Sequence, residues 1–169
     1  MRKSRKKTVL VLGAGVAGAA VARHLARAGV NVHVVERAGA VGGRAGDLGC
    51  KATDVCQRCN VCVAHEVFRA IGTIPGVHLH LNAEVEALLP SDTGTRYPAR
   101  LRRAARGQDR VAAVPEDLNA DAVVLATGYD PYDPRQAGAY GYGRLPNVIT
   151  GEEAERQLAR ASRITRPSD

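Results

Sequence analysis

The first forty residues alternate between short apolar runs and one longer run with helical periodicity. Residues 8–12 form a β-branched and apolar run, which is typical of a strand buried on both faces. Residues 16–28 are rich in alanine at helical spacing, and Gly29 would end that helix. A second β-branched run, residues 31–35, leads to Glu36. This order predicts a right-handed βαβ unit with parallel strands.

The pattern changes twice after this unit. Between residues 37 and 61 the periodicity is lost, and the glycine- and cysteine-rich stretch is interpreted as a functional loop. Helical spacing returns over residues 62–71, with an expected buried face of Val63, Val67, Phe68 and Ile71. Short strands are predicted at residues 77–81, 84–89, 97–103, 110–114 and 122–125. The turn Gly107-Gln108-Asp109 suggests a hairpin or β-meander there, and residues 152–162 predict a terminal helix.

Composition supports an α/β protein with a parallel sheet. The chain has 169 residues, which suits one domain, and 45% of them are apolar. With no Trp and one Phe, the core must rest on Val, Ala and Leu. No uninterrupted apolar run is long enough to span a membrane.

The net charge of +7 comes partly from two basic clusters. One is residues 1–7; the apolar run behind it is too short for a secretory signal, so a cytoplasmic protein is expected. The other consists of Arg96, Arg100, Arg102, Arg103, Arg106 and Arg110. Nucleic-acid binding is disfavoured, because few aromatic residues are interleaved and no nucleic-acid motif is present. A solvated surface plus one anionic cofactor is the favoured interpretation, and a docking face for an acidic partner remains open.

A glycine-rich turn joins the first predicted strand to the first predicted helix. Its sequence is Gly13-Ala14-Gly15-Val16-Ala17-Gly18. In this context the first glycine permits a tight turn, the second lets a phosphate approach the backbone, and the third lets helix and strand pack closely. The helix N-terminus would then offer N–H groups to a pyrophosphate.

Glu36 lies 23 residues after Gly13, where a carboxylate can accept hydrogen bonds from adenosine ribose hydroxyls. A 2′-phosphate would be repelled there, so NADP is disfavoured, and Arg37 is a further candidate for cofactor binding. The competing interpretation is an ordinary tight turn with a surface glutamate. The turn alone does not distinguish FAD from NAD.

All four cysteines fall in one motif, Cys50-x5-Cys56-x2-Cys59-x2-Cys62. Packed CxxC steps in a protein expected to be cytoplasmic indicate metal rather than disulfides. The compact run favours a [4Fe–4S] cluster with Cys50 as the fourth ligand, and His65 is a weaker candidate. Structural zinc sites more often use two separated knuckles, but zinc and a redox dithiol both remain open. A positive setting for thiolates could come from Arg44, Lys51 and Arg58.

Two further segments resemble flavoproteins of the glutathione-reductase type. Gly42-Gly43-Arg44 follows the second strand at their distance, and residues 123–128 resemble their later segment ending in Ala126-Thr127-Gly128. The resemblance implies FAD as the cofactor and adds these residues to the candidate binding site. No Ser/His/Asp constellation is present, and no catalytic residue is assigned.

The chain as a whole resembles the N-terminal FAD-binding part of the A-type subunit of heterodisulfide reductase and its relatives in sulfur metabolism. The residues that carry the resemblance are 13–18, 41–44, 126–134 and 140–150. It implies a truncated Rossmann-like FAD-binding domain over residues 1–169, with a parallel sheet, a β-meander and a cysteine-rich iron–sulfur loop at 50–62. Family members continue beyond Asp169, so the chain would be a fragment, a split subunit or a reduced relative.

The functional expectation is an oxidoreductase subunit that passes electrons between FAD and [4Fe–4S], sometimes by bifurcation. Its expected partners are other heterodisulfide-reductase-like iron–sulfur subunits, with no nucleic acid and no membrane span; a homo-oligomer is left open. One alternative is a non-catalytic or zinc-stapled nucleotide-binding module that scaffolds a redox complex. Another is a stand-alone NAD-dependent oxidoreductase.

Overall fold

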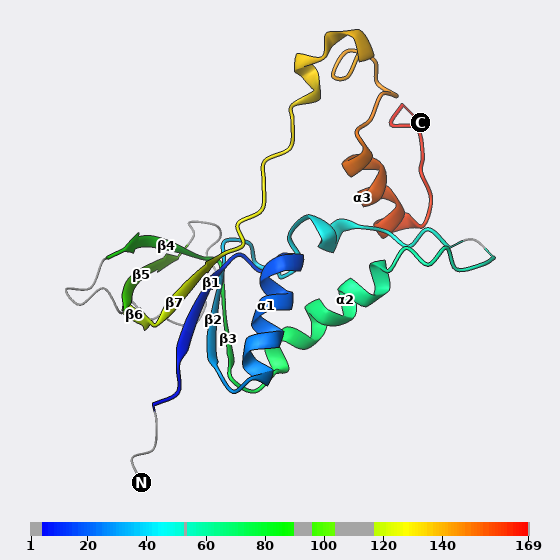
Figure 1. Ribbon diagram of the computed structural model, residues 1–169. Coiled ribbons are helices and arrows are strands. Elements are labelled where there is room, and N and C mark those ends of the chain that lie inside the picture. Colours follow the sequence, from blue (N-terminus) through cyan, green and yellow to red (C-terminus); the bar gives the residue numbers. More distant parts are fainter. Residues whose placement is uncertain (1–4, 53, 90–95, 104–116, 169) are drawn as a thin grey trace.

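A four-stranded parallel sheet forms the centre of the fold in the computed structural model, which describes residues 5–52, 54–89, 96–103 and 117–168. Its strands are β1 (Thr8–Leu12), β2 (Asn31–Glu36), β3 (Val77–Leu81) and β7 (Ala122–Leu125). They lie in the order β3-β2-β1-β7, and every neighbouring pair is parallel (Figure 1). The chain winds outward from β1 through β2 to β3 and then returns to the other side of β1. The carboxyl end of β1 is therefore a topological switch point, where such sheets bind ligands.

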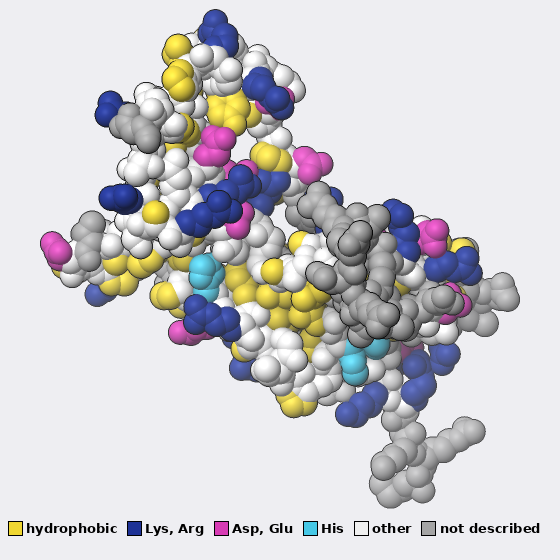
Figure 2. All heavy atoms as spheres, turned by 180° about the vertical axis from the view of Figure 1, so that it is seen from behind, with side chains coloured by type: hydrophobic (Ala, Val, Ile, Leu, Met, Phe, Trp, Pro, Cys, Tyr) yellow, Lys and Arg dark blue, Asp and Glu magenta, His cyan; other side chains and the backbone are white. Residues whose placement is uncertain are grey.

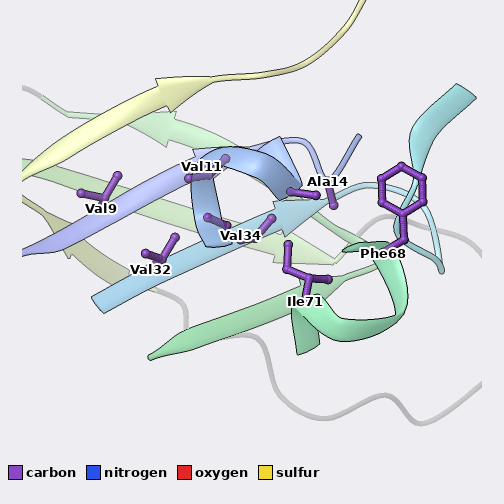
Figure 3. Close-up of a cluster of buried hydrophobic side chains, with 9 residues drawn as sticks. Val9, Val11, Ala14, Val32, Val34, Phe68 and Ile71 are labelled. Atoms are coloured by element: carbon purple, nitrogen blue, oxygen red, sulfur yellow. The ribbon is translucent and has the colours of Figure 1, made fainter. Parts of the chain in front are cut away.

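Two helices cover one face of this sheet. They are α1 (Val16–Arg27) and α2 (Val61–Ala70), which continues into a 3₁₀ turn, η2 (Ile71–Thr73). Figure 3 shows the apolar cluster between the layers. The cluster consists of Val9, Val11, Ala14, Ala19, Ala22, Val32, Val34, Phe68 and Ile71. Small alanines on α1 let the helix lie close to the valines of the sheet.

The buried face of α2 was predicted with one error. Phe68 and Ile71 are buried and Val67 is partly buried against the cluster, as expected. Val63 is instead 53% exposed, and Val61 is buried at 8%. The helix begins at Val61, one residue before the predicted start. Val61 lies seven residues before the buried Phe68 and therefore shares its face, whereas Val63 lies five residues before it and falls on another face.

A three-stranded antiparallel sheet covers the opposite face of the parallel sheet. It contains β4 (Ala83–Leu88), β5 (Tyr97–Arg103) and β6 (Asp117–Ala120), in the order β4-β5-β6. Its buried residues meet the other face of the central strands in a second cluster of Leu10, Val35, Ala83, Ala99, Leu101, Leu118 and Ala120. The predicted β-meander is confirmed. The strand predicted at 110–114 and the turn Gly107-Gln108-Asp109 lie outside the described residues.

The chain leaves the sheet after β7 and returns in a helix. Residues 126–150, here named the arm, extend away from the sheet and contain two 3₁₀ turns, η3 (Pro134–Gln136) and η4 (Gly138–Tyr140) (Figure 1). The helix α3 (Gly151–Ala161) begins with a capping box, in which Thr150 and Glu153 satisfy each other's backbone amides. It runs back to contact η1 (Gly43–Asp47), a 3₁₀ helix inside the region predicted to be a loop. The fold class expected from the sequence, a Rossmann-like FAD-binding fold, is confirmed. Across the described ranges, no helix has the length and apolar character needed to cross a membrane.

Candidate functional site

The glycine turn lies at the carboxyl end of β1, and each of its three glycines has a different surrounding. Gly13 has φ +99°, and a Cβ there would lie 2.3 Å from the backbone oxygen of Ala126. A Cβ at Gly18 would lie 1.9 Å from the oxygen of Gly13. At Gly15, by contrast, φ is −73° and a Cβ would meet no other described atom within 4 Å. Gly13 and Gly18 therefore serve the fold, while Gly15 leaves space beside the backbone.

The space beside Gly15 lies at the N-terminus of α1. Gly15 is the N-cap, and it offers no side chain to the first-turn amides. The backbone N–H groups of Val16, Ala17 and Gly18 have no partner within the helix, since the first residues of any helix lack one. Together with the positive end of the helix dipole, they form a site suited to a phosphate group.

A second glycine loop closes on this turn from the side. Gly42 donates its amide to the oxygen of Ala14 over 2.8 Å. Gly42 and Gly43 both have positive φ, and a Cβ at Gly43 would lie 3.3 Å from the Cα of Gly15. Only glycine lets the two backbones approach this closely in this conformation. The structure thus brings residues 42–43 against residues 13–18, as the predicted shared binding site requires.

Glu36 holds the turn together through its carboxylate. Its Oε2 accepts from the amide of Ala14 and its Oε1 from the amide of Ala38, both at 2.8 Å. The residue is 8% exposed. Each carboxylate oxygen has lone-pair capacity for a second donor, so ribose hydroxyls can still be accepted.

A pocket of about 310 Å³ opens at this edge of the parallel sheet. It is lined by Leu12, Gly13, Val35, Glu36, Arg37, Ala83, Glu84, Val85 and Thr127. The lining places Glu36, Arg37 and Thr127, three predicted binding residues, around one cavity beside the glycine turn. Ala126 donates its amide to the oxygen of Leu12 over 2.8 Å, and Gly128 has φ +75° as the chain turns into the arm. The residues present fit the adenosine and pyrophosphate part of a dinucleotide.

Arg44 contacts protein groups on three sides. Its Nε and Nη2 donate to the oxygen of Tyr129 over 3.2 and 3.0 Å, and its Nη1 lies 3.3 Å from Glu152. The guanidinium also lies 5.0 Å from the centroid of the Tyr129 ring, at cation–π range. Arg44 therefore links the second glycine loop to the arm and to α3. Its role in binding the cofactor directly stays a prediction.

The cysteine loop lies on the surface between η1 and α2. All four cysteines are free and exposed. In the first CxxC step the amide of Arg58 donates to the Sγ of Cys56 over 3.4 Å. In the second, a hydrogen bond from the amide of Val61 is the largest of the influences that lower the pKa of Cys59. The positive φ of Arg58 (52°) and Asn60 (61°) accompanies these two backbone turns. Both steps thus direct an amide toward a sulfur, and at Cys59 this contact stabilises the thiolate.

The cysteine side chains are chemically suited to an iron–sulfur cluster or to zinc, but the positions of the described cysteines do not form a metal site. Four thiols, two of them with N–H···S contacts, are suitable ligands for either. Within the described part of the chain, however, no group of three or more His, Cys, Asp or Glu side chains is placed to hold a metal ion. His65, the weaker candidate, has its Nε2 3.3 Å from the oxygen of Ala45. The metal assignment of Cys50, Cys56, Cys59 and Cys62 stays a prediction.

On the face shown in Figure 2, the charged side chains of the described residues do not form one continuous basic patch. Basic and acidic side chains lie side by side over the upper half of the molecule in Figure 2. In the predicted arginine cluster, Arg100 pairs with Asp117 at 3.6 Å and Arg102 with Glu84 at 2.8 Å. The part of this cluster at Arg106 and Arg110 lies outside the described residues, and so does the side chain of Arg103. Two arginines of this cluster thus have carboxylate partners on the antiparallel sheet.

Comparison with known families decides the wider assignment. A family model described as pyridine nucleotide-disulphide oxidoreductase matches residues 7–165. The chain belongs to this oxidoreductase family. The predicted resemblance to the A-type subunit of heterodisulfide reductase is confirmed by relatives of that name, and together these findings support a redox protein with an FAD-binding-type domain.

Two relatives and one solved structure show how far the similarity extends. The A-type subunit of the H(2):CoB-CoM heterodisulfide,ferredoxin reductase of Methanothermobacter thermautotrophicus is 40% identical over 70 residues, covering 38% of this chain and 11% of that protein. An A-type iron-sulfur subunit of the CoB–CoM heterodisulfide reductase of Methanopyrus kandleri is 29% identical over 133 residues, covering 69% and 20%. Thioredoxin reductase of Lactococcus lactis shares the fold with a TM-score of 0.53 and 18% identity, covering 76% of this chain and 37% of that one. The chain thus spans only a tenth to a fifth of the length of these two curated relatives.

Sequence reasoning missed two groups of residues in this family member. The first is a set of stacked histidines, His33, His78 and His80, on the parallel sheet, with ring centroids 4.6 and 5.2 Å from His33. Alternation along β2 and β3 could have placed them on one face, but not their register. The second is a set of ion pairs between α3 and residues 44–51. No sequence signal identifies these pairs, because the partners are about a hundred positions apart.

Proposed function

We propose that this chain is an FAD-binding electron-transfer subunit of a heterodisulfide-reductase-like complex and that residues 1–169 act as one Rossmann-type unit. The observation that carries the proposal is that one short segment serves both candidate sites. Gly42 is hydrogen-bonded to Ala14 in the glycine turn, and Cys50 follows it by eight residues. A flavin held at the turn and a metal centre held by the cysteines would therefore share a common support.

The FAD part of the proposal rests on the geometry of the carboxyl edge of the sheet. Gly15 leaves space for the pyrophosphate at the amides of Val16, Ala17 and Gly18, and Glu36 can accept from the ribose. A second carboxylate, Glu84, lines the same pocket but is paired with Arg102, so the preference against a 2′-phosphate rests on Glu36 at the ribose position. Bound FAD would supply conversion between paired and single electrons.

The cluster part rests on the donor set. Cys50, Cys56, Cys59 and Cys62 supply four thiols within thirteen residues, and amide–sulfur contacts already exist at two of them. Such contacts stabilise cluster ligands and tune the potential of the cluster. Four free thiols also fit a reducing compartment, so we propose a cytoplasmic protein.

Partner subunits are proposed to dock on the arm. The chain is poor in aromatic residues, yet four of its five tyrosines lie at positions 129–142. Several large apolar side chains in and beside the arm are exposed: Leu125, Tyr129, Tyr132, Tyr140 and Leu145. Exposed tyrosines with nearby arginines are typical of protein interfaces. The heterodisulfide reductase relatives are named as subunits, which supports the existence of partner subunits for this chain.

Anaerobic purification tests the proposal directly. We expect the protein to carry flavin, seen as two resolved visible bands, together with iron and acid-labile sulfide that give a broad shoulder. Flavin, iron and sulfide should each be measured per chain. A preparation that lacked flavin, iron and sulfide even after reconstitution would overturn the proposal.

A zinc-stapled nucleotide-binding module is the second candidate, favoured by one observation. Four free cysteine thiols within one loop are also the donor set of a structural zinc site. Stoichiometric zinc without visible absorbance, after an attempted cluster reconstitution, would support this candidate over the first.

A further inference from the structure

Residues 44–51, here named the strut, connect the second glycine loop to the cysteine loop. Cys50 is part of the strut. Gly43, the residue immediately before the strut, lies against Gly15. Three charged side chains recur along it at Arg44, Asp47 and Lys51. Interactions that hold the strut in place therefore fix the position of Cys50 relative to the glycine turn.

The helix α3 presents the opposite charges to all three. Glu152 lies 3.3 Å from Arg44, Arg156 lies 3.1 Å from Asp47, and Glu155 lies 2.6 Å from Lys51. The helix positions 152, 155 and 156 are three and four residues apart, so they share one face. Glu152 and Arg156 also pair with each other along the helix. The result is an alternating network rather than isolated surface pairs.

At the centre of the contact between the strut and α3, the backbone of the strut packs directly against the helix. Gly49 is buried, and a Cβ there would lie 2.6 Å from the Cβ of Leu158 and 2.7 Å from the amide of Ala159. Glycine at position 49 therefore allows the strut to touch α3 directly. The residue next to this close approach is Cys50.

Glu155 is a side chain of α3 that contacts the strut on both sides of Cys50. Its Oε2 accepts from the amide of Gly49 over 3.1 Å as well as from Lys51, and Lys51 in turn donates to the oxygen of Gly49 over 3.1 Å. The Lys51 and Glu155 side chains are 33% and 24% exposed, whereas Arg156 and Asp47 are 43% and 51% exposed. More exposed pairs are worth little, because solvent screens them. The Glu155 carboxylate thus accepts hydrogen bonds from both neighbours of Cys50, Gly49 and Lys51.

We infer that α3 is a clamp that fixes Cys50 relative to the flavin-binding glycines and that Glu155 is the positioning residue for this cysteine. The inference rests on the proposed function, because it takes Cys50 as a metal ligand. It adds a role for a helix more than a hundred residues away from the ligand it positions. With Cys50 held by α3 and Cys62 held in α2, Cys56 and Cys59 lie on the exposed span between two fixed ends.

Glu155→Ala and Glu155→Gln test the clamp, with Glu86→Ala on the exposed face of β4 as the matched control. We expect Glu155→Ala to speed hydrogen exchange of the Gly49 amide by about tenfold or more, since a hydrogen bond to a charged acceptor is lost. The same variant should take up less iron and sulfide on reconstitution, and its cluster should show an altered electron paramagnetic resonance line shape. FAD content should stay at the level of the starting protein. Glu155→Gln keeps an oxygen acceptor but no charge. Its exchange rate at Gly49 and its iron and sulfide content should therefore lie between those of Glu155→Ala and those of the unaltered protein.

The readouts separate failure of the clamp from failure of the proposed function. If the unaltered protein takes up no iron and sulfide, the cluster proposal fails, while exchange at Gly49 still reports on the clamp. If Glu155→Ala matches Glu86→Ala in exchange, iron and line shape, the clamp is wrong. Should Glu155→Ala fail to fold, Glu155→Gln carries the same test, and unchanged exchange and iron content in that variant would overturn the inference.

Discussion

The glycine turn and the cysteine loop are equally clear as sequence motifs, yet the chain assembles them to different degrees. At the turn, Gly13, Gly18 and Glu36 are fixed by backbone contacts and by the buried layer beneath them. In the loop, all four cysteines are exposed, and described residues do not converge into a metal site.

The difference follows from what each site is made of. The proposed phosphate site consists of backbone amides and glycine geometry, which form as soon as β1 and α1 pack. The cysteine site consists of side chains whose common partner would be an ion, and metal binding itself supplies the free energy that brings such ligands together. Substitutions in the turn and in the loop test this contrast.

Gly18→Ala should damage the turn and the fold together. The added Cβ would lie 1.9 Å from the oxygen of Gly13, so α1 must move away from the strand. We expect a loss of about 3 kcal/mol in the free energy of unfolding, from the upper range of overpacking changes. Thermal unfolding should show a melting temperature about 6–12 °C lower for a chain of this length. Gly138→Ala, in an open part of the arm, should leave the melting temperature nearly unchanged; an equal loss there would contradict the packing argument.

Gly15→Val should abolish dinucleotide binding while the protein stays folded. The φ of −73° suits any residue, and the space around Gly15 is open, so the fold should lose at most about 1 kcal/mol from the poorer N-cap. The isopropyl group would occupy the space that a phosphate needs. FAD titration followed by fluorescence measures this loss, with Gly138→Val as the control. Retained FAD in Gly15→Val would show that the cofactor binds elsewhere.

Cys59→Ala should remove the metal centre and spare both the fold and the flavin. The side chain is exposed and outside both buried clusters, so its loss opens no cavity. Iron and sulfide per chain should fall well below the starting level, with an unchanged melting temperature of the metal-free protein. Val55→Ala, exposed in the same loop, is the matched control. Iron content equal to that of the control would mean that Cys59 is not a ligand.

The smallest effect is expected for the stacked histidines, which lie on the same parallel sheet as the glycine turn. Burial, followed by the nearby His78 and His80, lowers the pKa of His33 to about 4. An unfolded histidine has a pKa of about 6.5. Between these values the unfolded chain binds a proton that the folded chain does not, so stability falls as the pH drops through this window.

His33→Gln should therefore lose less melting temperature than the unaltered protein between pH 6.5 and pH 5. The comparison is made above the range where most carboxylates titrate. His24→Gln, at an exposed position on α1, should keep the full acid-induced loss. The same loss in both variants would show that His33 does not contribute.

Much of the fold could be read from local pattern. The predicted strands at 8–12, 77–81, 97–103 and 122–125 match the observed bounds, because alternation and β-branching act over a few residues. The buried face of α2 was less well determined by the local pattern. Val61 and Val63 are both apolar, and only the neighbouring sheet decides which of them is buried.

The amino-acid sequence by itself determined the βαβ unit, the place of Gly13, Gly15 and Gly18 in the turn between strand and helix, and the clustering of the four cysteines. These depend on glycine conformation and on spacing along the chain, which neighbouring residues encode. Only the tertiary structure decided that Arg44 binds the oxygen of Tyr129 and that Glu155 braces the backbone next to Cys50. Those partners are 85 and 106 positions apart, and charges of both signs recur throughout the chain. Packing of the arm and α3 selects one pairing among many that the sequence allows.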